Sequence, residues 1–201
     1  MKMSTLDRAL LLGAVLLCAY QIVVGIDTLS AAAILAYTIA FGTLLVAGLL
    51  LIILGFEALD SPIVMIVSTI IPLSLSLGLV WEFSASFRTP YLVFTLLGFL
   101  AVILTRSIPA PNRLPILTIA LVHGVAGIII FLLPILLSAQ GQVKPAFVLV
   151  GLGGALISLD GLLVSFLKTG KPILTKETIL KILPALWLVM TACFVAGFKF
   201  G

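Results

Sequence analysis

The chain has 201 residues, of which 63% are hydrophobic and only 9% are charged. A soluble domain has about 25% charged residues, so this chain has too little charge to cover a surface that faces water. The composition therefore excludes a soluble globular protein and predicts that lipid surrounds most of the chain. The net charge of +4 does not indicate a nucleic-acid partner, because the basic residues lie between apolar segments.

The apolar segments predict an all-α membrane protein. A membrane helix needs about 20 mostly apolar residues, within a range of about 17–25. The first segment is predicted to span the membrane, because its apolar core is longer than that of a signal peptide. The whole chain, 1–201, is expected to form a single transmembrane domain with no soluble domain. The predicted bundle of about seven helices covers residues 6–26, 29–56, 62–80, 90–105, 114–138, 146–167 and 178–198.

Aromatic and charged residues cluster between the third and fourth predicted helices. Trp81, Phe83 and Tyr91 are expected at the membrane interface, where aromatic side chains are common. Glu82 and Arg88 are expected to pair beside them, as a surface ion pair of small energetic effect.

The distribution of lysine and arginine predicts the orientation. With seven spans, eight of the 11 basic residues fall on one side, and the side richer in basic residues stays in the cytoplasm. The N-terminus is therefore predicted inside and the C-terminus outside, in a prokaryotic cytoplasmic membrane or an organellar membrane. The first side carries Lys2, Arg8, Arg106, Arg113, Lys168, Lys171, Lys176 and Lys181, and the second carries Arg88, Lys144 and Lys199.

The order of the helices is compatible with an internal repeat. The first three and the last three helices would form two parallel triplets around the fourth, with Pro72 and Pro184 in the third helix of each. Internal repeats are typical of transporters. The two triplets share no motif beyond these prolines.

Asp160 is the acidic residue deepest inside an apolar segment. A charge at the centre of a membrane helix costs about 2.5–3.5 kcal/mol on insertion scales, which favours a functional role in proton or substrate binding. Two other interpretations remain: a hydrogen-bonded acid that joins two helices, or a shifted span that leaves Asp160 near the lipid headgroups.

His123, the only histidine, lies in the fifth predicted helix. A structural interpretation is a helix-packing histidine bonded to a backbone carbonyl. A lone histidine does not form a bis-histidine haem site or a closed metal site, so we predict no metal and no cofactor. Cys18 and Cys193 lie in apolar segments without a CxxC motif and are expected to pack as small apolar residues.

The depths of several polar residues agree. At 1.5 Å per residue, His123 lies about 15 Å, Asp160 about 12 Å and Trp187 about 13 Å from the predicted cytoplasmic ends of their helices. Ser68 and Thr69 fall near the same level of the third helix. The sequence thus predicts one polar layer, which we interpret as a candidate substrate or proton pathway.

Small residues follow one face of the sixth predicted helix and accompany His123 on the fifth. Such residues let membrane helices approach closely, so helix packing is the expected role, with the lining of a narrow passage as the alternative. They are Gly154, Ser158, Gly161 and Ser165 on the sixth helix and Gly124 and Gly127 on the fifth.

Three classes of function remain. The buried polar layer and in-span prolines favour a permease or channel-like protein for a proton, a small weak acid or an apolar solute. The alternative is an accessory or assembly subunit that binds another membrane protein or a second copy of itself. The third is an intramembrane lipid-modifying enzyme, for which only His123 and Asp160 qualify. No GxSxG, HExxH or P-loop pattern occurs, so no catalytic residue is assigned.

Overall fold

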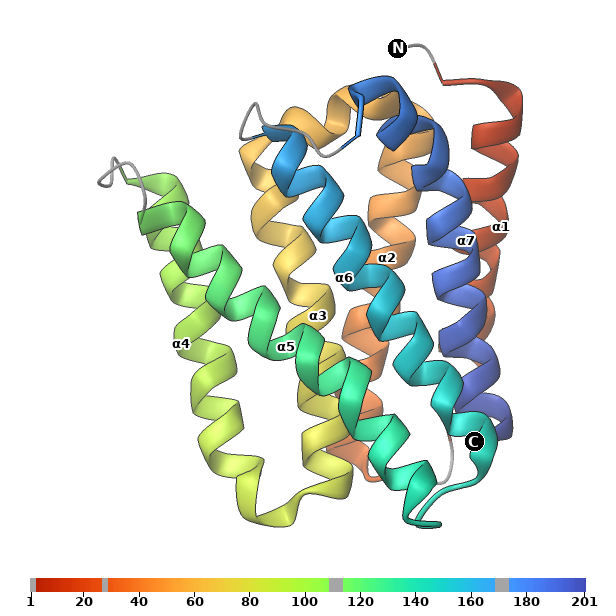
Figure 1. The fold of residues 1–201 in the computed structure, drawn as a ribbon, viewed down its shortest axis with the longest axis vertical. Coiled ribbons are helices and arrows are strands. Elements are labelled where there is room, and N and C mark those ends of the chain that lie inside the picture. Colours follow the sequence, from red (N-terminus) through yellow and green to blue (C-terminus); the bar gives the residue numbers. More distant parts are fainter. Residues whose placement is uncertain (1–2, 27–28, 109–113, 169–173) are drawn as a thin grey trace.

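The computed structural model describes residues 3–26, 29–108, 114–168 and 174–201 (Figure 1). Within these ranges, all regular structure is helical, and seven helices are long and apolar enough to cross a membrane. The prediction of a multi-pass helical bundle in a membrane is thereby confirmed. The helices are α1 Thr5–Val24, α2 Ala31–Leu54, α3 Pro62–Phe83, α4 Arg88–Ser107, α5 Leu114–Ala139, α6 Val148–Lys168 and α7 Lys176–Phe200.

Local sequence signals explain several helix ends. Ser4 and Asp7 form a capping box at the start of α1, in which the Asp7 backbone N–H donates to Ser4 Oγ at 3.1 Å and the Ser4 N–H donates to Asp7 Oδ2 at 2.8 Å. Pro62 stands in the first turn of α3, where its missing N–H has no intrahelical partner to lose. Three short 3₁₀ helices join the longer ones: η1 Gly55–Asp60, η2 Ala85–Phe87 and η3 Pro145–Phe147.

The aromatic residues near the α3–α4 connection do not all lie where the sequence predicts. Trp81 and Phe83 belong to the last turn of α3, which continues three residues beyond its predicted end at residue 80. Tyr91 is buried, and its hydroxyl donates to Ser76 Oγ at 2.8 Å. Tyr91 therefore joins α4 to α3 inside the bundle and is not exposed as an interfacial anchor would be.

Glu82 and Arg88 also have partners other than those predicted. Glu82 Oε2 accepts from the backbone N–H of Ser30 at 2.9 Å and from its hydroxyl at 2.7 Å. Arg88 Nε donates to the Trp81 carbonyl at 2.6 Å. Glu82 thus connects the start of α2 to the end of α3, and Arg88 closes the α3–α4 connection.

Six of the helices form a ring. Around this ring α1 packs on α2, α2 on α3, α3 on α5, α5 on α6, α6 on α7, and α7 on α1 again. Helix α4 lies outside the ring against α3 and α5, which corrects the prediction that two triplets surround it (Figure 1). The triplets α1–α3 and α5–α7 face each other directly. Each occupies one half of the ring, and their helices follow one another in the same order around it.

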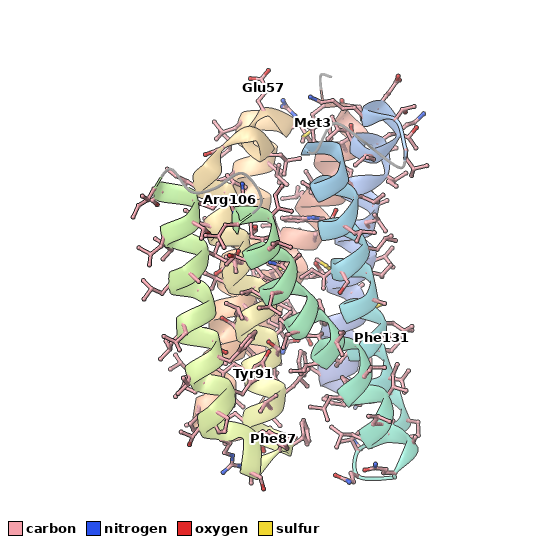
Figure 2. All side chains as sticks on the ribbon, turned by 60° about the vertical axis from the view of Figure 1, so that its left-hand side comes forward. Met3, Glu57, Phe87, Tyr91, Arg106 and Phe131 are labelled. Atoms are coloured by element: carbon pink, nitrogen blue, oxygen red, sulfur yellow. The ribbon has the colours of Figure 1, made fainter. Side chains whose placement is uncertain are left out.

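The two ends of the ring are filled differently. We call the end that holds the start of α1, η1 and the start of α7 the N-terminal end; Glu57 and Arg106 lie there and Phe87 lies at the opposite, C-terminal end (Figure 2). Aromatic side chains from α2, α3, α7 and η3 pack together toward the C-terminal end, with successive ring centroids 4.5–6.5 Å apart. This aromatic plug consists of Tyr37, Phe41, Phe83, Phe147, Phe194 and Phe198.

Orientation stays a prediction with a direct test. Four of the basic residues that the sequence assigns to the cytoplasm lie near the N-terminal end of the bundle: Arg8, Arg106, Lys176 and Lys181. Lys2, Arg113, Lys171 and the side chain of Lys168 lie outside the described residues. We expect a topology reporter fused after Ser107 to read as cytoplasmic and one fused after Gly201 as external. Reporters that read on the same side would contradict the seven-span topology, because three spans separate these positions.

Candidate functional site

A cavity of about 950 Å³ lies inside the ring, mainly in its N-terminal half. Its volume is at the upper end of the range of about 300–1,000 Å³ that is usual for small-molecule sites. Helices α2, α3, α5, α6 and α7 contribute most of the lining, which is aliphatic apart from a small set of polar side chains. The polar side chains are Ser68, Arg106, His123, Ser158, Asp160 and Trp187.

The cavity exists because α5 and α6 touch along only part of their length. A Cβ atom added to Gly154 would lie 2.9 Å from the Ile130 carbonyl oxygen, and one added to Gly127 would lie 2.6 Å from Ser158 Oγ. One turn nearer the N-terminal end, a Cβ on Gly124 or Gly161 would meet no atom within 4 Å. Figure 1 shows the cause: α5 crosses the bundle obliquely and leaves α6 toward α4.

The small residues therefore divide into two groups. Gly127, Gly154 and Ser158 lie where α5 and α6 are in contact, and Ser158 Oγ also donates to the Gly154 carbonyl at 2.8 Å. Gly124 and Gly161 line the cavity without such a contact, and Gly127 and Ser158 line it as well. The side chain of Ser165 lies outside the described residues. Helix contact and cavity lining thus both occur along α5 and α6.

The cavity also reaches the outside of the bundle at the level of the membrane core. Ile128 and Phe131 near the middle of α5, and Leu162 on α6, line the cavity and are also exposed. In a membrane, exposed aliphatic residues at mid-span face lipid. The cavity is therefore open at this level of the bundle.

Asp160 and Trp187 are in direct contact across α6 and α7. The indole Nε1–H of Trp187 donates to Asp160 Oδ2 at 3.0 Å. The sequence predicts this shared level because the rise per residue is fixed in both helices. The second oxygen, Asp160 Oδ1, is buried and has no hydrogen-bond partner among the described residues.

The remaining residues of the predicted polar layer separate into lining and buried positions. His123 lines the cavity, and its Nδ1 is buried without a hydrogen-bond partner among the described residues. Ser68 of α3 lines the cavity as well. Thr69 is fully buried and takes no part in the lining. No hydrogen bond joins His123 to Asp160 in the described part of the chain.

Arg106 is a cavity residue that the sequence assigned to the surface of the bundle. It lies in the last turn of α4, and its Nε is buried without a hydrogen-bond partner among the described residues. Its position at the end of an apolar segment indicated a membrane-surface residue. Only the packing of α4 against α3 and α5 brings it to the cavity, and that packing has no signal in the sequence.

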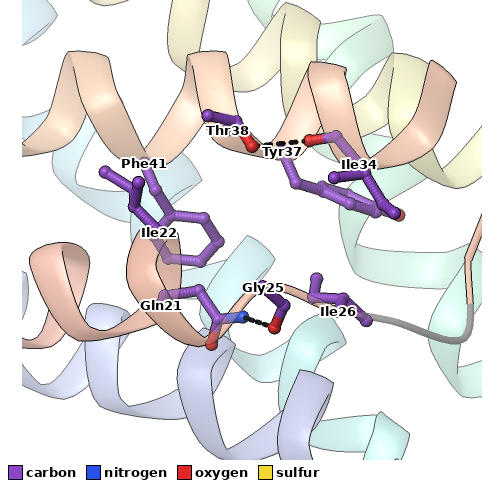
Figure 3. Close-up of a pocket in the computed structure, with 8 residues that line it drawn as sticks. All are labelled: Gln21, Ile22, Gly25, Ile26, Ile34, Tyr37, Thr38 and Phe41. Carbon is purple, nitrogen blue, oxygen red and sulfur yellow. Dashed lines mark hydrogen bonds between the residues drawn. The ribbon is translucent and has the colours of Figure 1, made fainter. Parts of the chain in front are cut away.

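A second pocket, between α1 and α2, is very small. Its volume is about 10 Å³, which leaves space for about one water molecule. Gln21 Nε2 donates to the Gly25 carbonyl at 3.1 Å and Thr38 Oγ1 to the Ile34 carbonyl at 2.8 Å, so both side chains bond within their own segments (Figure 3). This pocket is too small to be a solute site.

The Asp160–Trp187 contact leads to a stability prediction. Asp160→Ala leaves the buried Trp187 N–H unpaired and should lower the free energy of unfolding by about 1–3 kcal/mol. Asp160→Asn should unfold close to the temperature of the unchanged protein, because its amide oxygen can accept the same hydrogen bond. Thermal unfolding in detergent measures both variants. Equal losses of stability in Asp160→Ala and Asp160→Asn would show that the charge of Asp160, rather than this hydrogen bond, stabilises the site.

Within the described residues, no group of three histidine, cysteine, aspartate or glutamate side chains is placed to hold a metal ion. Comparison of the chain with protein-family models, with curated proteins and with solved structures gives no match.

Proposed function

We propose that this membrane protein is a permease-like protein that binds a largely apolar solute in the cavity of the helical ring. The observation that carries the proposal is the cavity itself. It combines an aliphatic lining with a few polar atoms around Asp160 and His123, the usual composition of a small-molecule site. Its access from mid-membrane suits a solute that dissolves in lipid.

The asymmetry of the ring supports a role in transport. The cavity occupies the N-terminal half, whereas the aromatic plug fills the interior toward the C-terminal end. A transporter alternates between states open to one side, usually by moving two repeats against each other. Two triplets that face each other around a cavity closed at one end suit such a movement.

The other two interpretations have less support. A lipid-modifying enzyme needs cooperating polar groups, but Asp160 bonds to Trp187 and makes no hydrogen bond to His123 in the described residues. An accessory subunit requires no internal cavity. Exposed aliphatic residues do not favour a partner protein, because lipid covers such surfaces equally well.

Solute binding can be tested with Trp187 as the reporter. The chain has two tryptophans, and Trp81 does not line the cavity, so Trp81→Phe leaves a single fluorophore at the site. In lipid nanodiscs, the neutral amphiphile 12-bromododecanol should quench Trp187 saturably, because bromine quenches at short range. Quenching that rises linearly with the amphiphile in the membrane would contradict the proposal.

A pair of glycine variants provides the matched control. Gly161→Phe should fill the cavity and weaken saturable quenching at least tenfold without lowering the unfolding temperature, since space surrounds this position. Gly42→Phe also enters open space, but Gly42 lies outside the cavity lining, so quenching should be unchanged. Equal effects of the two variants would show that the probe does not occupy the cavity.

A further inference from the structure

The unsatisfied oxygen of Asp160 restricts the chemistry of the solute. Asp160 Oδ2 accepts the hydrogen bond from Trp187, but Oδ1 is buried with no partner in the described residues. A carboxylate surrounded by apolar groups is unfavourable unless a cation or several hydrogen-bond donors compensate it. One indole N–H supplies a single neutral donor, so a further donor is required at Oδ1.

The charged groups of the chain do not supply this donor in the described structure. His123 and Arg106 both line the cavity, and each keeps a buried nitrogen without a hydrogen-bond partner among the described residues. Arg106 stands in the last turn of α4, near the N-terminal end (Figure 2). Asp160 lies eight residues before the end of α6, which is about 12 Å from that end along the helix axis. Oδ1 is therefore available to a hydrogen-bond donor of the solute.

The surroundings of Asp160 favour a cationic donor over a neutral one. Trp187 lines the cavity beside the carboxylate, and tryptophan is the side chain that forms the strongest cation–π contacts. Met190, one turn further along α7, continues the lining with a polarisable, flexible side chain. The rest of the cavity is aliphatic and suits a hydrocarbon chain.

We infer that the cavity binds an amphiphilic amine, with its ammonium group on Asp160 Oδ1 and its alkyl chain along the aliphatic lining toward the lateral opening at Ile128 and Leu162. This inference rests on the proposed function and specifies its substrate class. The ammonium N–H groups complete the hydrogen bonding of the carboxylate, and the two charges neutralise each other inside the membrane. Arg106, the competing cation of the cavity, would instead favour an anionic head group.

Three unbrominated probes of equal chain length test the charge preference in the Trp81→Phe protein, by how well each displaces the quencher 12-bromododecanol from the cavity: dodecylammonium, dodecanol and dodecanoate. The remaining quenching of Trp187 is compared at equal concentrations of the probes in the membrane, so that partitioning does not contribute. The ammonium probe should bind at least tenfold more tightly than the alcohol, and the carboxylate probe most weakly. Equal binding of ammonium and alcohol, or tightest binding of the carboxylate, overturns the inference.

Two variants locate the charge responsible. Asp160→Asn should reduce binding of the ammonium probe to the level of the alcohol, and thermal unfolding of the same variant reports whether the fold around the cavity is intact. Glu57→Gln removes an equal charge from an exposed residue outside the cavity lining and should change neither. An ammonium preference that survives Asp160→Asn overturns the inference. If the alcohol binds saturably without any charge preference, only the amine specificity fails; if no probe binds saturably, the proposed function fails as well.

Discussion

Replacing Phe194 with alanine should lower the free energy of unfolding by about 3–5 kcal/mol, the usual cost of removing a large aromatic side chain from a packed interior. Phe194 is fully buried. Its ring stands edge-on to Phe41 with centroids 6.5 Å apart, and a Cβ on Gly153 would come within 2.7 Å of it. It therefore joins α7 to both α2 and α6.

Thermal unfolding in detergent measures this loss, with Phe87→Ala as the control. Phe87 is 65% exposed in the short helix η2, so the same truncation there should change stability by less than about 0.5 kcal/mol, as is usual for surface positions. Similar effects at both positions would indicate that the aromatic plug adds little to stability.

Gly154→Leu should also be strongly destabilising, by at least the 1–3 kcal/mol that is typical of an overpacked core. A Cβ at this position would lie 2.8 Å from the backbone carbon of Ile130, and backbone cannot move aside as a flexible side chain can. The two helices must separate, and the contact between α5 and α6 that closes one end of the cavity is lost.

Gly161→Leu provides the control on the same helix. It adds the same side chain where no atom lies within 4 Å, so the unfolding temperature should stay close to that of the unchanged protein. A loss at Gly161 equal to that at Gly154 would contradict the separation of α5 and α6 at this level.

Much of the fold could be predicted from the sequence because spans depend on local composition. The ends of α1 to α7 differ from the predicted ends by at most three residues, since a run of apolar residues long enough to cross a bilayer has few other stable structures. Neighbour relations could not be predicted. Lipid surrounds α4 and the ring helices alike, so the composition of residues 88–107 does not reveal that α4 is peripheral.

Of the candidate site, the shared level of Asp160 and Trp187 could be predicted in the same way. Counting residues placed Asp160 and Trp187 at one level, and their hydrogen bond follows from the packing of α6 on α7. The cavity depends on the oblique direction of α5, which many side-chain contacts determine together. Gly127 and Gly124 therefore look alike in the sequence, although one touches α6 and the other faces open space.

The peripheral position of α4 has a consequence for the evolution and engineering of the chain. Each triplet contains an odd number of spans, so joining residue 83 directly to residue 114 would insert the second triplet upside down relative to the first. One additional crossing restores parity, and α4 supplies it without occupying a place in the ring. On this view α4 is a topological adaptor: its length and hydrophobicity are constrained, but most of its lipid-facing sequence is free to change. Two separately expressed halves, each inserted in the correct direction, would not need it.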